Sequence, residues 1–223
     1  MSGRRPDVTK AWDFEHHFRE TLPNCTALPE AFKTSGWFTT GVGKLFHKNL
    51  PPNFDPQSWT DPADLPISYG YRNWNHANAG GPQDPESFDD CDRKLVDEAL
   101  TRLALAAQRY HGAESQPFFV GCGLRNVHIP YHYPPAFGEL YPPAASFATA
   151  AHPVMDASQP EVAWYDQQSG SKNQGVGTYG DVHASGDIHR HQPMNHTEAQ
   201  IVRRNYYAAT SYSDDQVRSN SNS

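Results

Sequence analysis

Three residues of this chain have side chains that suit the binding of an anionic ester. Lys44 and His47 end the run Gly-Val-Gly-Lys-Leu-Phe-His at 41–47, and His128 follows a second apolar run by a few residues. A lysine offers three donors and a positive charge to an oxyanion, while a histidine can hydrogen-bond a hydroxyl or transfer a proton near neutral pH. Spacing alone also allows the plainer interpretation, in which Lys44 is solvated and the histidines only pack.

The first of two helix-and-strand pairs is expected to position the lysine and the first histidine. Residues 28–36 predict a short helix, because a proline is tolerated in the first turn and Gly36 suits the left-handed position after the last turn. The aromatic and β-branched residues 37–42 then predict a strand, and Gly43 lets the chain turn away from it. The two side chains should therefore emerge at the carboxyl end of a strand, where open α/β sheets carry their chemistry.

The second pair has the strongest periodicity in the chain. A helix is predicted after Asp89 or Asp90 as N-cap, because apolar residues then recur at helical spacing. The predicted buried stripe is Leu95, Val96, Ala99, Leu100, Leu103, Ala107 and Tyr110, and the predicted charged face is Asp92, Arg93, Asp97, Glu98 and Arg102. Residues 118–122 follow as a run that is apolar on both faces, typical of a central parallel strand in which Cys122 packs as a small hydrophobe. Two such pairs predict an α/β fold with a largely parallel sheet flanked by helices.

Long irregular segments separate the predicted elements. Residues 49–85 and 143–194 lack periodicity and are rich in turn formers, so both are predicted as irregular insertions, the first packed by its Trp and Tyr side chains. A last helix is predicted from Thr197, as N-cap, to about Val217. Its expected buried stripe is Ile201, Val202, Tyr206, Ala208, Ala209 and Tyr212. One domain over residues 1–217 and a disordered polar tail over 218–223 are expected.

The balance of charge argues against a nucleic-acid partner. The formal net charge is -7 and the pI is about 5.9, which leaves no basic footprint for a phosphate backbone. No apolar run approaches the roughly 20 residues that a transmembrane helix needs. The first ten residues are basic and polar, so no signal peptide is predicted there.

No metal site is predicted from these residues. The three cysteines form neither a disulfide framework nor a Cys-x-x-Cys zinc motif. A stretch rich in possible ligands holds Asp181, His183, Asp187, His189, His191 and His196. Coordination by such a segment without packed support is poorly selective, so a physiological site there is not favoured.

Several short motifs occur in an order that resembles a known family. They are Gly3, Arg4 and Pro6, the run 41–47, the run 118–130 with Tyr133-Pro134, and the segment 203–212. In these motifs and their order the chain resembles the sulfatase family, most closely its iduronate-2-sulfatase branch. The resemblance implies a partial sulfatase or alkaline-phosphatase-like sandwich, and a lysosomal, periplasmic or secreted location.

The resemblance also implies roles for individual residues in the hydrolysis of a sulfate ester, such as a sulfated saccharide. Lys44 would bind a sulfate oxygen, His47 would hydrogen-bond the hydroxyl of the nucleophile, and His128 would stabilise the sulfate or its leaving oxygen. The family uses a formylglycine made from cysteine as nucleophile and a calcium ion that withdraws charge.

This sequence departs from the family pattern at the residues with the largest catalytic effect. Its 223 residues contain no Cys-x-Pro-Ser-Arg signature and no Asp-His-Gly metal motif. Asn126-Val127 stands where the branch has lysine and proline, which lowers the charge near His128. The chain alone is therefore expected to be inactive.

Two alternatives remain open at this stage. One is a catalytically silent protein that binds sulfated glycans, for which the aromatic residues Trp59, Tyr69, Tyr71 and Trp74 could stack on sugar rings. The other is a phosphodiesterase or phosphonate hydrolase of the wider alkaline-phosphatase superfamily, because sulfate and phosphate present similar tetrahedral oxyanions to a lysine and two histidines.

Overall fold

The chain forms two compact units, each of which is described by itself. The computed structural model describes residues 1–12, 16–46, 51–60, 81–82, 91–113, 115–128, 131–154, 156–160 and 193–219. The first unit takes in residues 1–72, 90–125 and 220–223, and the second takes in 73–89 and 126–219. The single domain expected over residues 1–217 stays a prediction.

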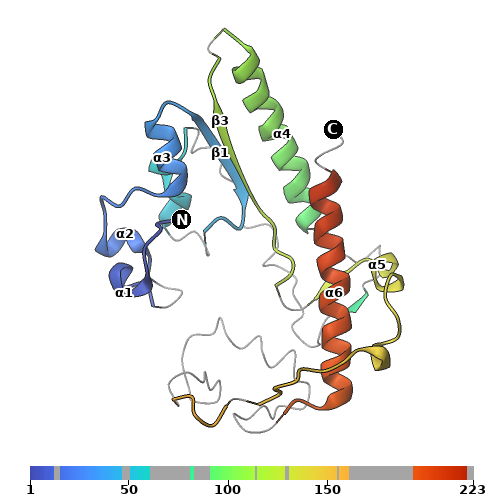
Figure 1. Cartoon of the computed structure of the whole chain (residues 1–223). Coiled ribbons are helices and arrows are strands. Elements are labelled where there is room, and N and C mark those ends of the chain that lie inside the picture. Colours follow the sequence, from blue (N-terminus) through green and yellow to red (C-terminus); the bar gives the residue numbers. More distant parts are fainter. Residues whose placement is uncertain are drawn as a thin grey trace. The chain divides into compact units, whose positions relative to one another are not determined.

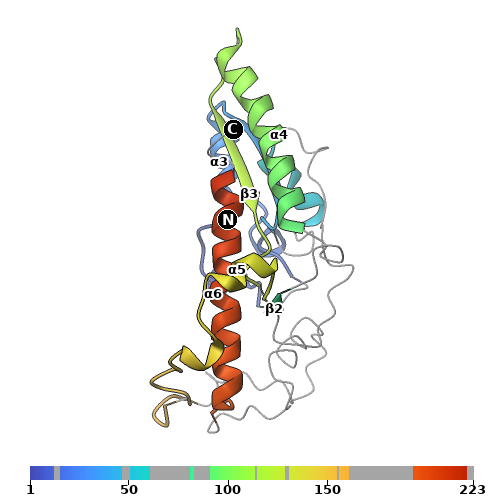
Figure 2. The same ribbon diagram turned by 90° about the vertical axis from the view of Figure 1, so that its right-hand side faces the viewer.

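A parallel strand pair forms the centre of the first unit. Strand β1 (Phe38–Gly43) runs beside β3 (Phe118–Gly123) in continuous register, from Phe38 opposite Phe118 to Gly43 opposite Gly123. Helix α3 (Leu28–Thr34) packs on one face of the pair and α4 (Cys91–His111) packs on the other (Figures 1 and 2). The prediction of an α/β fold with a parallel sheet flanked by helices is confirmed.

The alternation of side chains along β1 explains these two layers. Val42 points toward α4 and packs with Leu95 and Ala99 in a buried cluster. On the opposite face, Phe32 of α3 stacks on Phe119 of β3, with ring centroids 4.9 Å apart. Successive side chains of a strand point to opposite faces, so the strand pair contributes side chains to both layers.

The buried stripe of α4 differs from its predicted one in the second half of the helix. Leu95, Val96 and Ala99 are buried as predicted, whereas Leu103 and Tyr110 are exposed by 38% and 49%. The residues buried despite their predicted place on the charged face are Asp92 and Arg102. The predicted N-cap residues, Asp89 and Asp90, lie outside the described residues.

Hydrogen bonds explain why these two charged residues of α4 are buried. The guanidinium of Arg102 donates to Oγ1 of Thr40 on β1 at 2.8 Å and to Oε1 of Glu98 at 3.0 Å. Oδ1 of Asp92 accepts the backbone N–H of Arg125 at 2.6 Å. Buried charges are tolerated where partners of this kind replace water. Apolar periodicity carries no signal for such contacts.

Cys122 is exposed, which corrects the prediction that it packs as a small hydrophobe. The strand was expected to be central, with neighbours on both edges. In the part of the chain that the structure describes, β3 pairs with β1 alone, so its other edge has no strand to cover it.

The start of the predicted insertion 49–85 is ordered and packs against β1. Two short 3-10 helices, η1 (Pro52–Phe54) and η2 (Pro56–Ser58), lead into Trp59, which is fully buried. Thr39 of β1 and Thr60 exchange backbone and hydroxyl hydrogen bonds at 2.9 to 3.2 Å. The packing role predicted for Trp59 is confirmed, while Tyr69, Tyr71 and Trp74 lie outside the described residues.

The remaining helices of the first unit are short. Helix α1 spans Pro6–Thr9 and α2 spans Phe18–Thr21. The chain then turns through residues 22–27 into α3, whose first turn is capped by Glu30, because its Oε2 accepts the N–H of Ala27 at 3.0 Å. Gly36 follows α3 with a φ of 85°, the left-handed conformation predicted for it.

The second unit is built on the long helix α6 (His196–Ser219). Against it lie α5 (Pro135–Glu139), the 3-10 helix η4 (Ala144–Ser146) and β4 (His132–Tyr133), which pairs in parallel with β2 (Gly81–Pro82). Tyr133 is fully buried, packs with Ala208, Ala209 and Tyr212, and donates from its hydroxyl to Oδ1 of Asn205 at 2.8 Å.

Helix α6 begins two residues earlier than an N-cap at Thr197 predicts, and it ends two residues later than predicted. Asn195 caps it in place of Thr197, because its Oδ1 accepts the N–H groups of Thr197 at 2.9 Å and Glu198 at 3.3 Å. Ala208, Ala209 and Tyr212 are buried as predicted, but Ile201 and Tyr206 are exposed by 41% and 42%, and polar residues such as Asn205 are buried instead. Residues 220–223 of the predicted tail lie outside the described residues.

Candidate anion-binding site

The turn after β1 delivers Lys44 at the carboxyl end of the strand, as the sequence predicts. Gly43 adopts a φ of 82°, and a Cβ at this position would lie 2.2 Å from the carbonyl oxygen of Gly123. The backbone N–H of Lys44 donates to that same oxygen at 2.7 Å, and the N–H of Leu45 donates to the Gly43 oxygen at 2.9 Å. A glycine is therefore required at position 43 both by conformation and by the close approach of the neighbouring strand.

Lys44 is exposed, and its surroundings disfavour the charged form of its ammonium group. Partial desolvation lowers the pKa of its ammonium group below 10.5, and the positive charge of Arg125 lowers it further. Arg125 follows β3 by two residues and is 7% exposed, and its backbone is held by Asp92. Lys44 and Arg125 thus bring two positive charges near the ends of adjacent parallel strands.

Sequence reasoning did not single out Arg125 and Asp92, which lie near the turn of Lys44. Asp92 falls on what the helical pattern marks as a solvated face, and Arg125 lies between an apolar run and the more conspicuous His128. The available signal is the topology of the predicted sheet, because the residues that follow two neighbouring parallel strands meet at the same edge.

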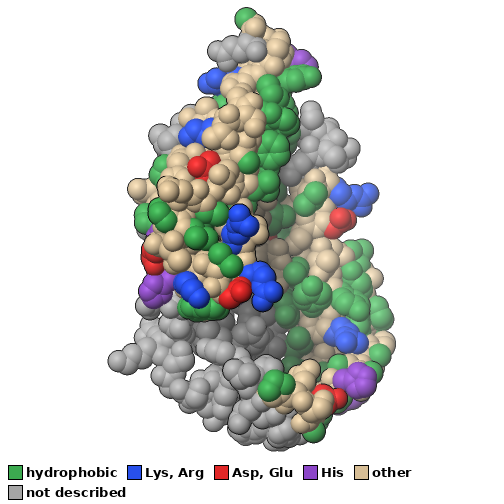
Figure 3. Space-filling model, turned by 60° about the vertical axis from the view of Figure 1, so that its left-hand side comes forward, with side chains coloured by type: hydrophobic (Ala, Val, Ile, Leu, Met, Phe, Trp, Pro, Cys, Tyr) green, Lys and Arg blue, Asp and Glu red, His purple; other side chains and the backbone are tan. Residues whose placement is uncertain are grey.

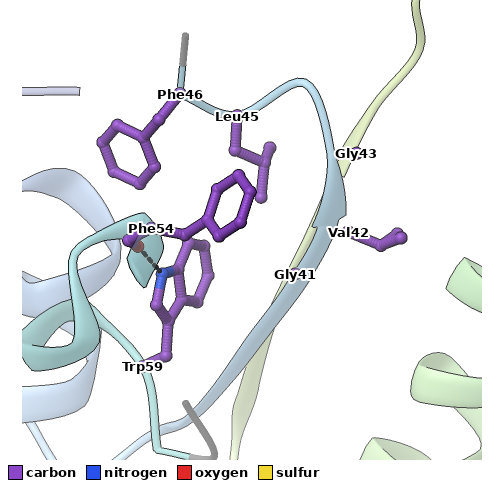
Figure 4. Close-up of a pocket in the computed structure, with 7 residues that line it drawn as sticks. All are labelled: Gly41, Val42, Gly43, Leu45, Phe46, Phe54 and Trp59. Carbon is purple, nitrogen blue, oxygen red and sulfur yellow. Dashed lines mark hydrogen bonds between the residues drawn. The ribbon is translucent and has the colours of Figure 1, made fainter. Parts of the chain in front are cut away.

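Apolar side chains form the floor beneath the turn. Leu45 and Phe46 fold back toward Phe54 and Trp59 around a small apolar pocket, while Val42 points the other way (Figure 4). The indole Nε1 of Trp59 donates to the carbonyl oxygen of Phe54 at 2.8 Å, which fixes the ring in place (Figure 4). The turn that carries Lys44 is thus packed from below by side chains of the 51–60 segment.

The packing of Leu45 and Trp59 beneath the turn also depends on Gly41. A Cβ on this residue would lie 2.5 Å from Cδ1 of Leu45 and 2.9 Å from the ring of Trp59. Gly121, its partner across the pair, likewise faces Leu45. The glycines of the 41–47 motif therefore make room for the floor of the turn.

The structure does not test the grouping of Lys44 with the two histidines. His47 lies in residues 47–50, outside the described residues. His128 is half-buried in a turn of the second unit, whereas Lys44 belongs to the first. The three-residue site stays a prediction.

The described residues do not fit a metal ion. Within the described ranges, no group of three or more His, Cys, Asp or Glu side chains could hold one. The buried carboxylates are engaged otherwise, Asp55 by Arg19 and Ser58, and Asp92 by the Arg125 amide. The possible ligands from Asp181 to His191 lie outside what is described, and His196 is exposed at the start of α6.

Among the described residues on the face seen in Figure 3, the Lys and Arg side chains form no continuous stripe. Lys and Arg side chains stand there singly or in small groups, with hydrophobic and uncharged groups between them.

In the described part of the chain no helix is long and apolar enough to cross a membrane.

Comparison with known proteins identifies relatives over almost the whole chain. The chain is 31% identical to the iduronate 2-sulfatases of Mus musculus and Homo sapiens over 97% of its own length. It is 26% identical to a sulfatase of Formosa agariphila over 64% of its length. No family model matches the chain. The chain spans 40% of the length of the two iduronate 2-sulfatases and 31% of the bacterial sulfatase. On these matches, the chain belongs to the sulfatase family.

Proposed function

We propose that this chain forms the sulfate-binding part of a sulfate ester hydrolase that acts on sulfated saccharides. Lys44 binds a sulfate oxygen, His47 hydrogen-bonds the hydroxyl of the nucleophile, and His128 stabilises the sulfate or the leaving oxygen. The observation that carries the proposal is the 31% identity to iduronate 2-sulfatases across 97% of the chain. The position of Lys44 directly after β1 supports it, because the ammonium group is solvent-accessible there.

The chemistry assigned to these residues is binding and charge stabilisation. A sulfate monoester carries one negative charge on its non-bridging oxygens. As the S–O bond breaks, negative charge also develops on the leaving oxygen. An ammonium group at a strand end offsets the charge on the non-bridging oxygens, and a protonated imidazole can stabilise the leaving oxygen. The formylglycine and calcium ion of the family have no matching residues in the described part of the chain, so no step is assigned to them.

Replacement of Lys44 tests the proposal directly. We expect Lys44→Ala to raise the Kd for inorganic sulfate and for a sulfated monosaccharide roughly 10- to 100-fold, since a hydrogen bond to a charged group contributes about 1.5–3 kcal/mol. The measurement is isothermal titration calorimetry on the 223-residue chain. Lys10→Ala is the matched control, because Lys10 is also exposed in the first unit but lies over the ring of Trp12, 5.6 Å from its centroid.

One result would count against this function, and another against the inactivity expected of the chain alone. Equal Kd values for the wild type and Lys44→Ala would remove Lys44 from the site. Hydrolysis of an aryl sulfate by the 223-residue chain at rates well above background would contradict the expectation that this chain alone is inactive, which rests on the absence of Cys-x-Pro-Ser-Arg from its sequence.

The second candidate function is a catalytically silent protein that binds sulfated glycans. The same missing signature favours it, because binding by Lys44 needs no nucleophile. Assays on the longest protein product that contains this chain distinguish the two candidate functions. Hydrolysis of an aryl sulfate by that product supports the enzyme, and saccharide binding without hydrolysis supports the silent protein.

A further inference from the structure

One buried arginine connects the segments that surround the turn of Lys44. The guanidinium of Arg19, on α2, donates to both carboxylate oxygens of Asp55, at 2.8 and 2.7 Å, and to Oε2 of Glu30 at 2.7 Å. It also donates to the carbonyl oxygens of Pro23 and Cys25. The side chains of Arg19 and Asp55 are only 9% and 3% exposed. Arg19 therefore joins α2, the start of α3 and the 51–58 segment.

An aromatic contact leads from Arg19 to the turn. The Arg19 guanidinium lies over the ring of Phe18, 4.8 Å from its centroid. Phe18 in turn stacks on Phe46, with ring centroids 6.5 Å apart. Phe46 follows Lys44 by two residues, so this contact supports the turn from the side of α2.

A second route runs through Asp55 to the floor of the turn. Asp55 directly follows Phe54 in the chain and precedes Ser58 and Trp59 by a few residues. It also accepts a hydrogen bond from the Ser58 hydroxyl. Phe54 and Trp59 line the apolar pocket under Leu45, the residue after Lys44 (Figure 4). Because Arg19 fixes the position of Asp55, it also restrains the rings of Phe54 and Trp59 that pack beneath the turn.

The backbone of this segment needs such an anchor. Asn53, Phe54 and Asp55 have φ values of 52°, 56° and 60°, all in the left-handed region. Non-glycine residues in this region cost on the order of 1 kcal/mol each, and the conformation persists only where the surroundings fix it. The bidentate contact with Arg19 supplies that restraint in a form that a lysine, as a point charge, cannot reproduce.

We propose that Arg19 is a positioning residue of the anion site, which fixes the turn 43–46 through Phe18 and Asp55 and so sets the position of Lys44. The inference deepens the proposed function, on which its relevance to sulfate binding rests. Arg19 itself does not touch the anion.

The test compares two buried arginines of the first unit. Arg19→Met removes the anchor, whereas Arg102→Met removes an arginine of similar burial that binds Glu98 and Thr40 on the α4 side. Hydrogen exchange of the Trp59 indole N–H and titration of the Lys44 ε-carbon are followed by NMR in both variants. Sulfate affinity and melting temperature are measured alongside.

We expect Arg19→Met to increase the exchange rate of the Trp59 indole at least tenfold and to move the Lys44 pKa up toward 10.5, as the turn leaves its partly desolvated place near Arg125. Its Kd for sulfate should rise about tenfold. Arg102→Met should lower the melting temperature without either NMR change. Equal effects of the two variants, or an unchanged Lys44 in Arg19→Met, would overturn the inference.

Two further provisions keep the outcomes separable. If Arg19→Met does not fold, Arg19→Lys is used, with the same expected directions and the same opposing result. If wild-type protein binds no sulfate, the proposed function fails, but the indole exchange and the Lys44 titration still decide whether Arg19 positions the turn.

Discussion

The charge on Lys44 is disfavoured by its surroundings, and a bound anion would offset that effect. Desolvation and the charge of Arg125 both lower the pKa of the ammonium group. The folded protein therefore holds this proton less tightly than the unfolded chain does. Folding stability rises with pH from the lowered pKa up to 10.5, while anion affinity falls over the same window because the neutral amine attracts no anion.

Replacing Arg125 should move the titration of Lys44. We expect Arg125→Met to raise the Lys44 pKa, because one of its two causes of depression is removed, and to shift the loss of sulfate affinity to higher pH. The measurement is an NMR titration of the Lys44 ε-carbon with and without sulfate. Arg93→Met, at an exposed position of α4, is the control and should leave the titration in place. A Lys44 pKa that stays constant in Arg125→Met would show that desolvation acts alone.

At the scale of elements, the packing around the ends of β1 and β3 depends on paired glycines. Gly41 faces Gly121 and Gly43 faces Gly123 across the pair. Side chains at these positions would meet Leu45, Trp59 or the opposite backbone. The geometry of the strand ends therefore depends on residues that have no side chain.

A comparison of two glycines separates conformation from crowding. Gly36 and Gly43 both have positive φ, at 85° and 82°, but a Cβ at Gly36 meets nothing within 4 Å, whereas one at Gly43 meets the Gly123 carbonyl. We expect Gly36→Ala to lower the free energy of unfolding by about 1 kcal/mol and Gly43→Ala by roughly 3 kcal/mol or more. Urea denaturation gives both values. Similar losses in the two variants would mean that β1 and β3 can separate at little cost.

The sequence predicts the elements of this fold better than it predicts their polar contacts. The short helix before β1, both strands and their parallel pairing follow from apolar and glycine patterns. Arg19 and Asp55 are 36 residues apart, and the segment around Asp55 has no periodicity, so nothing local indicates their contact. The buried Arg102 is missed for the same reason, since a charged residue at a helical position is assigned to solvent unless its partner is known.

At the scale of the whole molecule, the charge balance limits which sulfated ligands suit the site. A net charge of -7 repels anions at long range, and the site attracts them only through its local cations. Repulsion of this kind grows with the number of charges on the ligand and is screened by salt over about 8 Å at physiological ionic strength. For the proposed sulfate site, we therefore expect a ligand with a single sulfate group to be favoured over a densely sulfated chain.

This preference can be measured with two ligands of the same sugar type. We expect a monosulfated saccharide to bind at least as tightly per sulfate group as a heparin-like polymer at low salt, with the polymer gaining relative to it as salt is raised. Calorimetric titrations at two salt concentrations provide the comparison. Much tighter binding of the polymer at low salt would indicate a basic surface elsewhere on the protein.

Three successive left-handed residues at 53–55 have a consequence for how this region gains its shape. A free peptide of this sequence would leave that conformation, so order in the segment comes from contacts supplied by distant parts of the chain. Such a segment has no stable half-formed state of its own. The segment is therefore ordered or disordered as a unit. The apolar floor beneath the turn of Lys44 is formed only when the segment is ordered.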